Sequence, residues 1–293
     1  MLLIILLYTP AFATDSYDAH NTVTCDGIFF QDVYYDREVL VKNLGRPYNL
    51  VLHKYSGYLF FSHTIRDGDQ VDFGIMSCHV DSKECKPITG VPGGYAIGYD
   101  KENDELYFGG HDGIYKYNFR TTKAEFFEED GKSIWAIFIR RNFYYIEYPS
   151  QRLYVYKHDK FVTVYEDIGI EVFNFFITKN LEIYFSNKTA LYKVDRTSEF
   201  PIMLDDETVV RQIVEDTYGD VYFCNNDGIH MEDKPYKRLK RIALIEQCFG
   251  MTFDEQQRLL YSDTDNIYRL NPSQDAQYCY DKLIYSKRKR NQS

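Results

Sequence analysis

The sequence is poor in the features that mark common enzyme and membrane classes. It has 293 residues and a single tryptophan, Trp135. After the first residues no apolar run approaches the ~18 residues of a membrane span, which argues against a transmembrane helix in the mature chain. It has no CxxC pair, zinc-type Cys/His spacing, HExxH motif or GxSxG elbow, so common zinc and serine-hydrolase sites are not indicated. The net charge of -10 argues against binding to a nucleic-acid backbone.

The sequence is instead rich in other aromatic residues. It contains 28 tyrosines and 21 phenylalanines, and aromatic residues make up 17% of the chain. Tyrosine and phenylalanine favour the half-buried surfaces of pleated sheets, and many segments alternate with period two. The composition therefore predicts an all-β protein with a sizeable core.

The N-terminus begins MLLIILLYTPAFA, an apolar stretch followed by a small-x-small pattern at Ala11–Ala13. This pattern predicts a secretory signal peptide over residues 1–13, followed by a short segment over 14–24. The alternative is a buried strand. With a signal peptide, the mature protein is expected to be exported and extracellular.

Six cysteines agree with an oxidising compartment. Cys78 and Cys85 flank a turn and are suited to staple a hairpin, and Cys25 and Cys279 lie near the two ends. Cys224 and Cys248 then remain, although six cysteines allow 15 pairings and each could be a buried thiol. Asn187 lies in an N-x-S/T sequon and is a predicted glycosylation site, and Asn291 lies in a second one near the C-terminus.

A repeated unit organises most of the chain. Each copy has an aromatic strand, a short polar turn and a second strand, with anchor aromatics at Phe61, Phe108, Tyr145, Phe185, Phe223 and Tyr261. A second marker, a short apolar run before each anchor, begins at Tyr48, Tyr95, Trp135, Phe173, Arg211 and Phe249. Both markers recur every 37 to 47 residues, which is the length of a four-stranded propeller blade.

The repeats predict one domain, a six-bladed β-propeller over residues 25–280. The strands in CDGIFFQDVYY belong to no repeat, so we expect them to complete the last blade and close the ring, with a Cys25–Cys279 disulfide locking the closure. Residues 281–293 form a basic tail that is expected to be disordered.

In a propeller the first strand of each blade lines the central channel. The six run-starting residues should therefore form a ring, next to the polar neighbours Asn49, Asn174 and Gln212. Aromatic rings stack on a flat ligand, Arg211 can pair with a carboxylate or sulfate, and amides can orient it. These nine residues are the predicted ligand-binding set. The alternative is that the large side chains simply plug the channel.

A catalytic or metal site is not predicted. Gluconolactonase-type propellers hold a divalent metal with a Glu, Asn and Asp set, and their Asp opens a DGxAxDxxGxxY repeat. The matching segment here is RQIVEDTYGDVY, with Arg211 in place of that Asp. Hard cations need several oxygen ligands, which this ring does not offer.

Several long runs resemble the ommochrome-binding proteins of moths and butterflies. They are GRPYNLVLHKYSGYLFFSHTI, VPGGYAIGYDKENDELYFGGHDGIYKYN, GKSIWAIFIRRNFYYIEYPSQRLYVY, EIYFSNKTALYK and VVRQIVEDTYGDVYFCNNDGI. The resemblance extends from about Cys25 to Asn271. It implies a secreted haemolymph protein that carries an ommochrome, a planar, acidic, tryptophan-derived phenoxazinone such as ommatin D. The resemblance assigns no binding residues.

The sequence thus predicts a pigment carrier that is not an enzyme and needs no cofactor beyond the bound pigment. The partner expected is this small aromatic ligand, and the oligomeric state stays open. Two alternatives remain, a lactonase-like hydrolase and a propeller that binds another protein.

Overall fold

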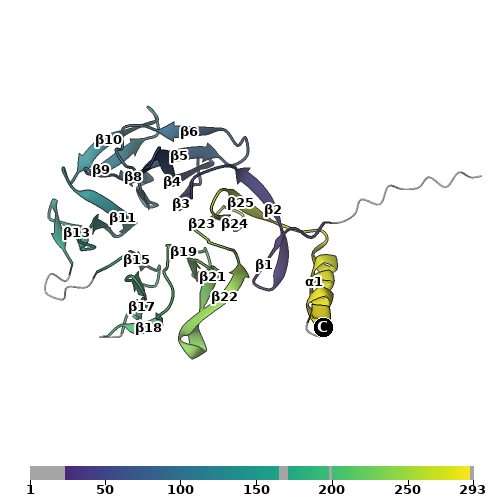
Figure 1. Cartoon of the computed structure of the whole chain (residues 1–293). Coiled ribbons are helices and arrows are strands. Elements are labelled where there is room, and N and C mark those ends of the chain that lie inside the picture. The colour runs from purple at the N-terminus through teal and green to yellow at the C-terminus, as the bar shows by residue number, and fades with distance from the viewer. Residues whose placement is uncertain (1–23, 165–170, 198–199, 291–293) are drawn as a thin grey trace, which may run out of the picture.

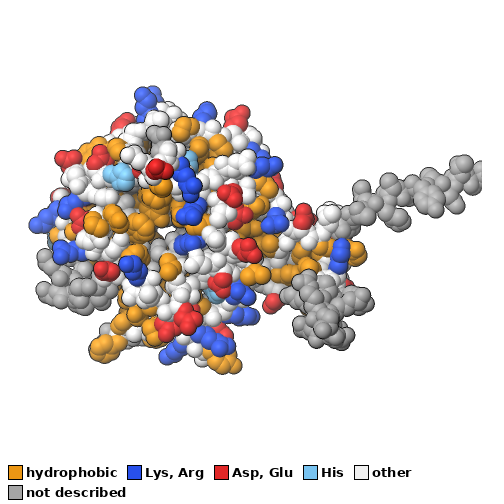
Figure 2. All heavy atoms as spheres, viewed as in Figure 1, with side chains coloured by type: hydrophobic (Ala, Val, Ile, Leu, Met, Phe, Trp, Pro, Cys, Tyr) orange, Lys and Arg blue, Asp and Glu red, His pale blue; other side chains and the backbone are white. Residues whose placement is uncertain are grey.

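Six antiparallel sheets surround a central axis in the computed structural model, which describes residues 24–164, 171–197 and 200–290 (Figure 1). The predicted six-bladed β-propeller is confirmed. The predicted signal peptide, nearly all of segment 14–24, and Asn291 lie outside the described residues. A hollow opens at the centre of the ring, with basic side chains beside it (Figure 2).

Each blade runs from an inner strand at the axis to an outer strand at the rim. Blade one comprises β3 (Tyr48–His53), β4 (Tyr58–Asp67), β5 (Gln70–His79) and β6 (Cys85–Ile88). Blade two comprises β7 (Ala96–Asp100), β8 (Glu105–Gly109), β9 (Ile114–Asn118) and β10 (Lys123–Glu128). Blade three comprises β11 (Ser133–Arg140), β12 (Asn142–Tyr148), β13 (Leu153–Lys157) and β14 (Lys160–Thr163).

The second half of the ring continues the pattern and then uses the start of the chain. Blade four comprises β15 (Asn174–Ile177), β16 (Ile183–Ser186), β17 (Leu191–Val194) and β18 (Ile202–Asp205). Blade five comprises β19 (Gln212–Glu215), β20 (Val221–Asn225), β21 (Gly228–Asp233) and β22 (Arg238–Leu244). Blade six comprises β23 (Gly250–Phe253), β24 (Leu259–Ser262) and β25 (Ile267–Pro272), joined by β2 (Val33–Val41) and β1 (Ile28–Phe30). A short 3-10 turn, Lys234–Tyr236, links β21 to β22.

The apolar core is divided into six clusters, one at each interface between neighbouring blades. The second strands of blades five and six are covered on both faces, and every residue of β20 and of β24 is buried. Five of the six anchor aromatics are buried, whereas Phe185 is half-buried and stacks on Tyr192 at 5.1 Å between ring centroids. In that blade Tyr184 takes the buried position and contacts Phe223.

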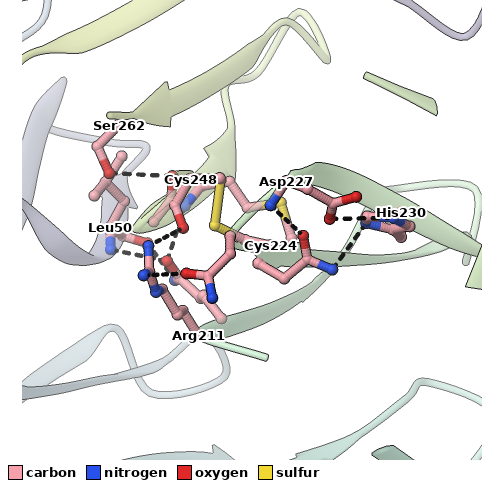
Figure 3. The surroundings of a disulfide bond; sticks show 12 residues. Leu50, Arg211, Cys224, Asp227, His230, Cys248 and Ser262 are labelled. Carbon is pink, nitrogen blue, oxygen red and sulfur yellow. Dashed lines mark hydrogen bonds and ion pairs between the residues drawn. A yellow bond between two sulfur atoms is a disulfide. The ribbon is translucent and has the colours of Figure 1, made fainter. Parts of the chain in front are cut away.

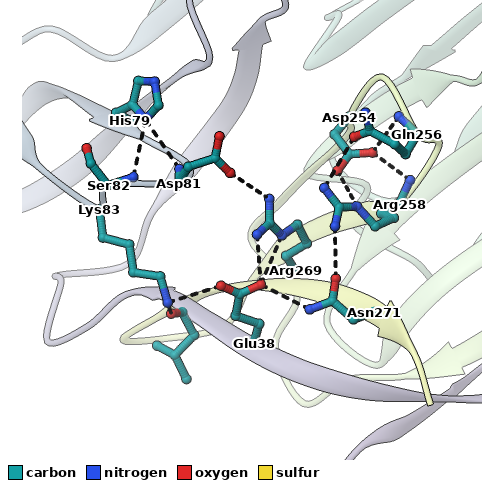
Figure 4. Close-up of polar contacts among 11 residues, drawn as sticks. Glu38, His79, Asp81, Ser82, Lys83, Asp254, Gln256, Arg258, Arg269 and Asn271 are labelled. Carbon is teal, nitrogen blue, oxygen red and sulfur yellow. Dashed lines mark hydrogen bonds and ion pairs between the residues drawn. The ribbon is translucent and has the colours of Figure 1, made fainter. Parts of the chain in front are cut away.

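The N-terminal strands close the ring, as predicted. β2 pairs with β25, so the sixth sheet has five strands in the order β1-β2-β25-β24-β23. A polar cluster reinforces this junction and reaches the first blade (Figure 4). The Glu38 carboxylate accepts hydrogen bonds from Arg269 Nη2 at 2.9 Å and Asn271 Nδ2 at 3.0 Å, and pairs with Lys83 Nζ at 3.1 Å.

Three disulfides join the cysteines in the pairs considered above: Cys25–Cys279, Cys78–Cys85 and Cys224–Cys248. The second staples the β5–β6 hairpin. The expected disordered tail is corrected, because α1 (Ala276–Arg290) continues through most of residues 281–293. The helix begins with the good helix formers Ala276 and Gln277, and the disulfide at Cys279 fixes its first turns to the ring.

Asn187 lies in the turn between β16 and β17. Its Oδ1 accepts hydrogen bonds from the backbone N–H of Thr189 and Ala190, and Lys188 and Thr189 are exposed. Glycosylation at this turn stays a prediction.

The closure should depend on pH through Glu38. Burial opposes ionisation of this carboxyl, but the hydrogen bonds from Asn271, Arg269 and Lys83 outweigh it and lower its pKa to about 2. Because the folded-state pKa is below that of the unfolded chain, the stabilisation is present above pH ~4.5 and is lost as the pH falls toward 2. We expect Glu38→Gln to reduce the free energy of unfolding at pH 7 by about 2 kcal/mol and to flatten its decline in that window.

Urea unfolding at pH 7 and at several acidic values checks this expectation. Glu125→Gln is the matched control, since Glu125 is exposed on outer strand β10. Equal stability of the two variants at pH 7 would contradict the assigned role of Glu38.

Candidate functional site at the central channel

The six predicted ring residues lie at the start of the inner strands. Four of them immediately precede the inner strand of their blade, Tyr48 is the first residue of β3, and Trp135 is the third residue of β11. All six therefore lie at one end of the channel. We call this set the aromatic mouth; it comprises Tyr48, Tyr95, Trp135, Phe173, Arg211 and Phe249.

The aromatic mouth is continuous from blade to blade. The ring centroid of Trp135 lies 4.8 Å from that of Tyr95 and 6.3 Å from that of Phe173. Tyr48 lies 5.5 Å from Tyr95 and 5.1 Å from Phe249. Phe249 is buried, whereas the other four rings are half-buried. Burial raises the pKa of the Tyr95 phenol, which therefore stays protonated. The side chains thus pack on one another and still present ring surface.

Two more aromatic residues that the repeat did not reveal extend this surface. Phe73, on the long β5 strand of the first blade, packs edge-on against Tyr95 at 4.7 Å. Tyr148, at the end of β12, stacks on Trp135 at 6.0 Å with an interplanar angle of 26°. Tyr148 is 53% exposed, so it forms the solvent side of a stack whose middle member is Trp135. Neither residue recurs in the other blades, which is why the period could not identify them.

Arg211 extends this set beyond Phe249 through a cation–π contact. Its guanidinium carbon lies 3.8 Å from the centroid of Phe249. Arg211 Nη1 donates to the carbonyl of Cys248 at 3.0 Å, and Nη2 donates to Asn226 Oδ1. Figure 3 shows Arg211 beside the Cys224–Cys248 disulfide, which fixes the segment that carries the acceptor carbonyl. The guanidinium is therefore held in place by neutral acceptors.

A second guanidinium lies over the same aromatic ring. The guanidinium carbon of Arg46 is 5.8 Å from the centroid of Phe249. Arg46 is exposed, and no ion pair joins either arginine to a carboxylate within the part of the chain that the structure describes. Burial, together with the like charge of Arg46, lowers the pKa of Arg211, although an arginine stays charged at neutral pH. Two cations thus lie over the Phe249 ring without a carboxylate partner among the described residues.

The predicted amides do not point into the mouth as free ligand groups. Asn49 Nδ2 donates to the carbonyl of Tyr95 at 2.9 Å, and Asn174 Nδ2 donates to the carbonyl of Val210 at 2.6 Å. Each bond joins one blade to the next, from equivalent positions in blades one and four. These amide nitrogens are therefore used to hold blades together.

Gln212 bonds to two other blades instead of one. Its Oε1 accepts from the backbone N–H of Leu50 at 3.2 Å and of Met251 at 2.9 Å, and its Nε2 donates to the carbonyl of Leu50 at 3.0 Å. One side chain of blade five thus connects blades six and one. We call Asn49, Asn174 and Gln212 the amide layer.

A cavity of about 860 Å³ begins at the amide layer and opens at the opposite end of the channel. All three amides line it, whereas none of the six residues of the aromatic mouth does. Apolar side chains of the inner strands form much of its wall, including Val51, Ile97, Phe138, Phe176, Val214 and Phe253.

Metal chemistry has no preformed ligand set here. No group of three or more His, Cys, Asp or Glu side chains within residues 24–164, 171–197 and 200–290 is arranged to hold a metal ion. Across those same residues, no helix combines the length and apolar character needed to cross a membrane.

Comparison with known sequences gives one informative relative. The chain is 25% identical over 244 residues to an ommochrome-binding protein of Manduca sexta, an alignment that covers 81% of this chain and 88% of that protein. The resemblance found in the sequence is thereby confirmed. No family model matches the chain.

Solved propellers share the fold at low sequence identity. A gluconolactonase of Xanthomonas campestris is 12% identical with a TM-score of 0.65, covering 85% of this chain and 96% of that one. The calcium-binding protein regucalcin of Agrobacterium tumefaciens is also 12% identical, with a TM-score of 0.63 and coverage of 82% and 96%. Likeness at this level shows the architecture alone.

The amide layer should matter for stability. Gln212→Ala removes the partner of two backbone N–H groups and one carbonyl near the channel axis, so we expect the free energy of unfolding to fall by about 2 kcal/mol. Denaturant unfolding followed by far-ultraviolet circular dichroism measures this change. Gln70→Ala, at an exposed position of β5, is the control, and a loss no larger than in that control would refute the structural role of Gln212.

Proposed function

We propose that this chain, a relative of the ommochrome-binding proteins, is a carrier that binds an ommochrome non-covalently at the aromatic mouth of its propeller channel. The observation that carries the proposal is the combination of contiguous aromatic rings with two guanidinium groups that lack carboxylate partners in the described part of the chain. An ommochrome of the ommatin type is planar and acidic, and so needs both kinds of contact.

The stack around Trp135 suits the planar part of such a ligand. The rings of Tyr95, Trp135 and Tyr148 follow one another in space. The interplanar angle is 31° between Tyr95 and Trp135 and 26° between Trp135 and Tyr148, and the outer ring, Tyr148, is exposed. A phenoxazinone can lie against this face or take the place of Tyr148 on Trp135. Each good aromatic contact contributes roughly 1 kcal/mol.

The arginines suit its acidic substituents. Arg211 is anchored by two hydrogen bonds on one side, which preorganises the guanidinium, and its planar group can bind a carboxylate or sulfate through two parallel bonds. Arg46 adds a second positive charge over the same phenylalanine. Rings, guanidinium groups and backbone carbonyls form a set suited to binding rather than to proton transfer, so we propose a carrier and not an enzyme.

We further propose that the protein works outside the cell, in haemolymph. The three disulfides support this, because such bonds persist in oxidising compartments. The signal peptide expected over residues 1–13 would supply the route of export.

Pigment titration tests the proposed site. Trp135 is the one tryptophan of the chain, so stacking of ommatin D should quench the protein's tryptophan fluorescence. We expect Arg211→Gln to weaken ommatin D binding about 10-fold or more, since a hydrogen bond to a charged group contributes about 1.5–3 kcal/mol. Trp135→Phe should weaken binding severalfold, measured by equilibrium dialysis with visible absorbance because this variant lacks the fluorescent reporter.

Arg120→Gln is the matched control, since Arg120 is exposed in the turn after β9 at the rim of blade two. It should bind like the wild type. If the Arg211 and Trp135 variants, folded as judged by circular dichroism, both bound ommatin D as well as this control, the pigment would not lie at the aromatic mouth.

A further inference from the structure

The cavity on the far side of the amide layer carries a repeated basic position. Counting six residues on from each member of the aromatic mouth reaches Lys54, Lys101, Arg141, Lys179, Thr217 and Glu255. All six line the cavity. Four are basic, and they come from four consecutive blades, one to four. We call Lys54, Lys101, Arg141 and Lys179 the basic collar.

The cations of the collar have no ion-pair partner among the residues that the structure describes. Lys179 Nζ donates to the carbonyls of Asp216 and Thr217 at 3.0 and 3.1 Å, and Lys54 Nζ lies 4.5 Å from the ring of Tyr55. The Lys101 side chain is accessible at the cavity opening, yet the surrounding protein lowers the pKa of its ammonium, and nearby cations add to this effect. The collar is therefore a group of four cavity-lining cations that form no ion pair with a carboxylate among the described residues.

Most carboxylates that line the cavity already accept hydrogen bonds or form an ion pair within the protein. Glu215 pairs with Arg140 at 2.8 Å and accepts the backbone N–H of Lys179, and its side chain is 1% exposed. Asp100, Asp216 and Asp254 each accept backbone N–H groups of their own turns. Only two carboxylates of the lining, Glu102 and Glu255, form no side-chain hydrogen bond or ion pair within the described residues.

We propose that this cavity is a second ligand site, separate from the aromatic mouth, for an organic anion with an apolar body. The body would contact the apolar wall between the amide layer and the opening, and the acidic group would lie at the collar beside blades one to four. A volume of about 860 Å³ falls in the range of small-molecule sites. Apolar walls with a few charged groups at one edge are typical of such sites.

The amide layer is what makes the two sites separate. Gln212 bonds to backbone groups of blades one and six across the axis, and Asn49 and Asn174 bond to the following blades. Tightly hydrogen-bonded side chains that also close the ring are costly to displace. A ligand in the cavity therefore meets the amide layer from one side, while the pigment proposed above meets the aromatic rings from the other.

Titration with 8-anilinonaphthalene-1-sulfonate tests the proposal, because this probe combines an apolar aromatic body with one sulfonate and fluoresces in apolar surroundings. We expect saturable binding to the full folded chain that weakens as salt increases. Lys101→Gln should raise the dissociation constant about fivefold, and the double change Lys101→Gln with Arg141→Gln more than 10-fold. Lys123→Gln, an equal loss of charge on outer strand β10, should leave it unchanged.

Filling the cavity gives an independent measurement. Thr252→Trp places a large ring at a half-buried lining position and should abolish probe binding. If that variant did not fold, the charge variants would still decide. Collar variants that bind the probe as tightly as Lys123→Gln would overturn the proposed site.

The same titrations separate this proposal from the pigment site. Saturating ommatin D should leave probe affinity unchanged, and Arg211→Gln should weaken the pigment but not the probe. If ommatin D displaced the probe, and its own affinity followed Lys101 rather than Arg211, the pigment would occupy the cavity and the two-site proposal would be wrong. Loss of pigment binding alone would leave the cavity site standing.

Discussion

The pairing of β2 with β25 is the contact on which the rest of the structure depends, because it joins the start of the chain to its end. Each blade buries one face on the next, so an open ring would leave two apolar faces in water. Closure also creates the site. It brings β23 beside β3, which sets Tyr48 against Phe249 and places Leu50 within reach of Gln212.

Repetition explains what the sequence could reveal. Two markers with one period were sufficient to identify six blades and to place Trp135 and Arg211 at equivalent positions. This is because every blade packs apolar side chains against the next blade in the same way. Features that occur once could not be found this way. Phe73 lies on the unusually long β4–β5 hairpin, and helix α1 lies outside the repeat, where it contacts β2. The direction of the Asn49 and Gln212 amides is set by carbonyls of other blades, which no local pattern records.

The channel has two chemically different ends built from the same six strands. Six residues of strand advance roughly 20 Å, so aromatic rings at one end and cations at the other are separated by a full strand length. The layer of amides between them has a structural reason to be polar, since it satisfies backbone groups at the axis. Polar character at the centre of a channel is therefore not by itself a sign of a binding site.

The Cys25–Cys279 bond spans 254 residues and makes the folded domain a covalent circle as well as a ring of sheets. A protease that cut any one exposed loop between these residues would linearise the circle without releasing a fragment. The broken ends would stay tethered through both the disulfide and the flanking blades, which remain paired to their neighbours. A protein built this way can lose a peptide bond in a protease-rich fluid and still keep both ends of its channel assembled.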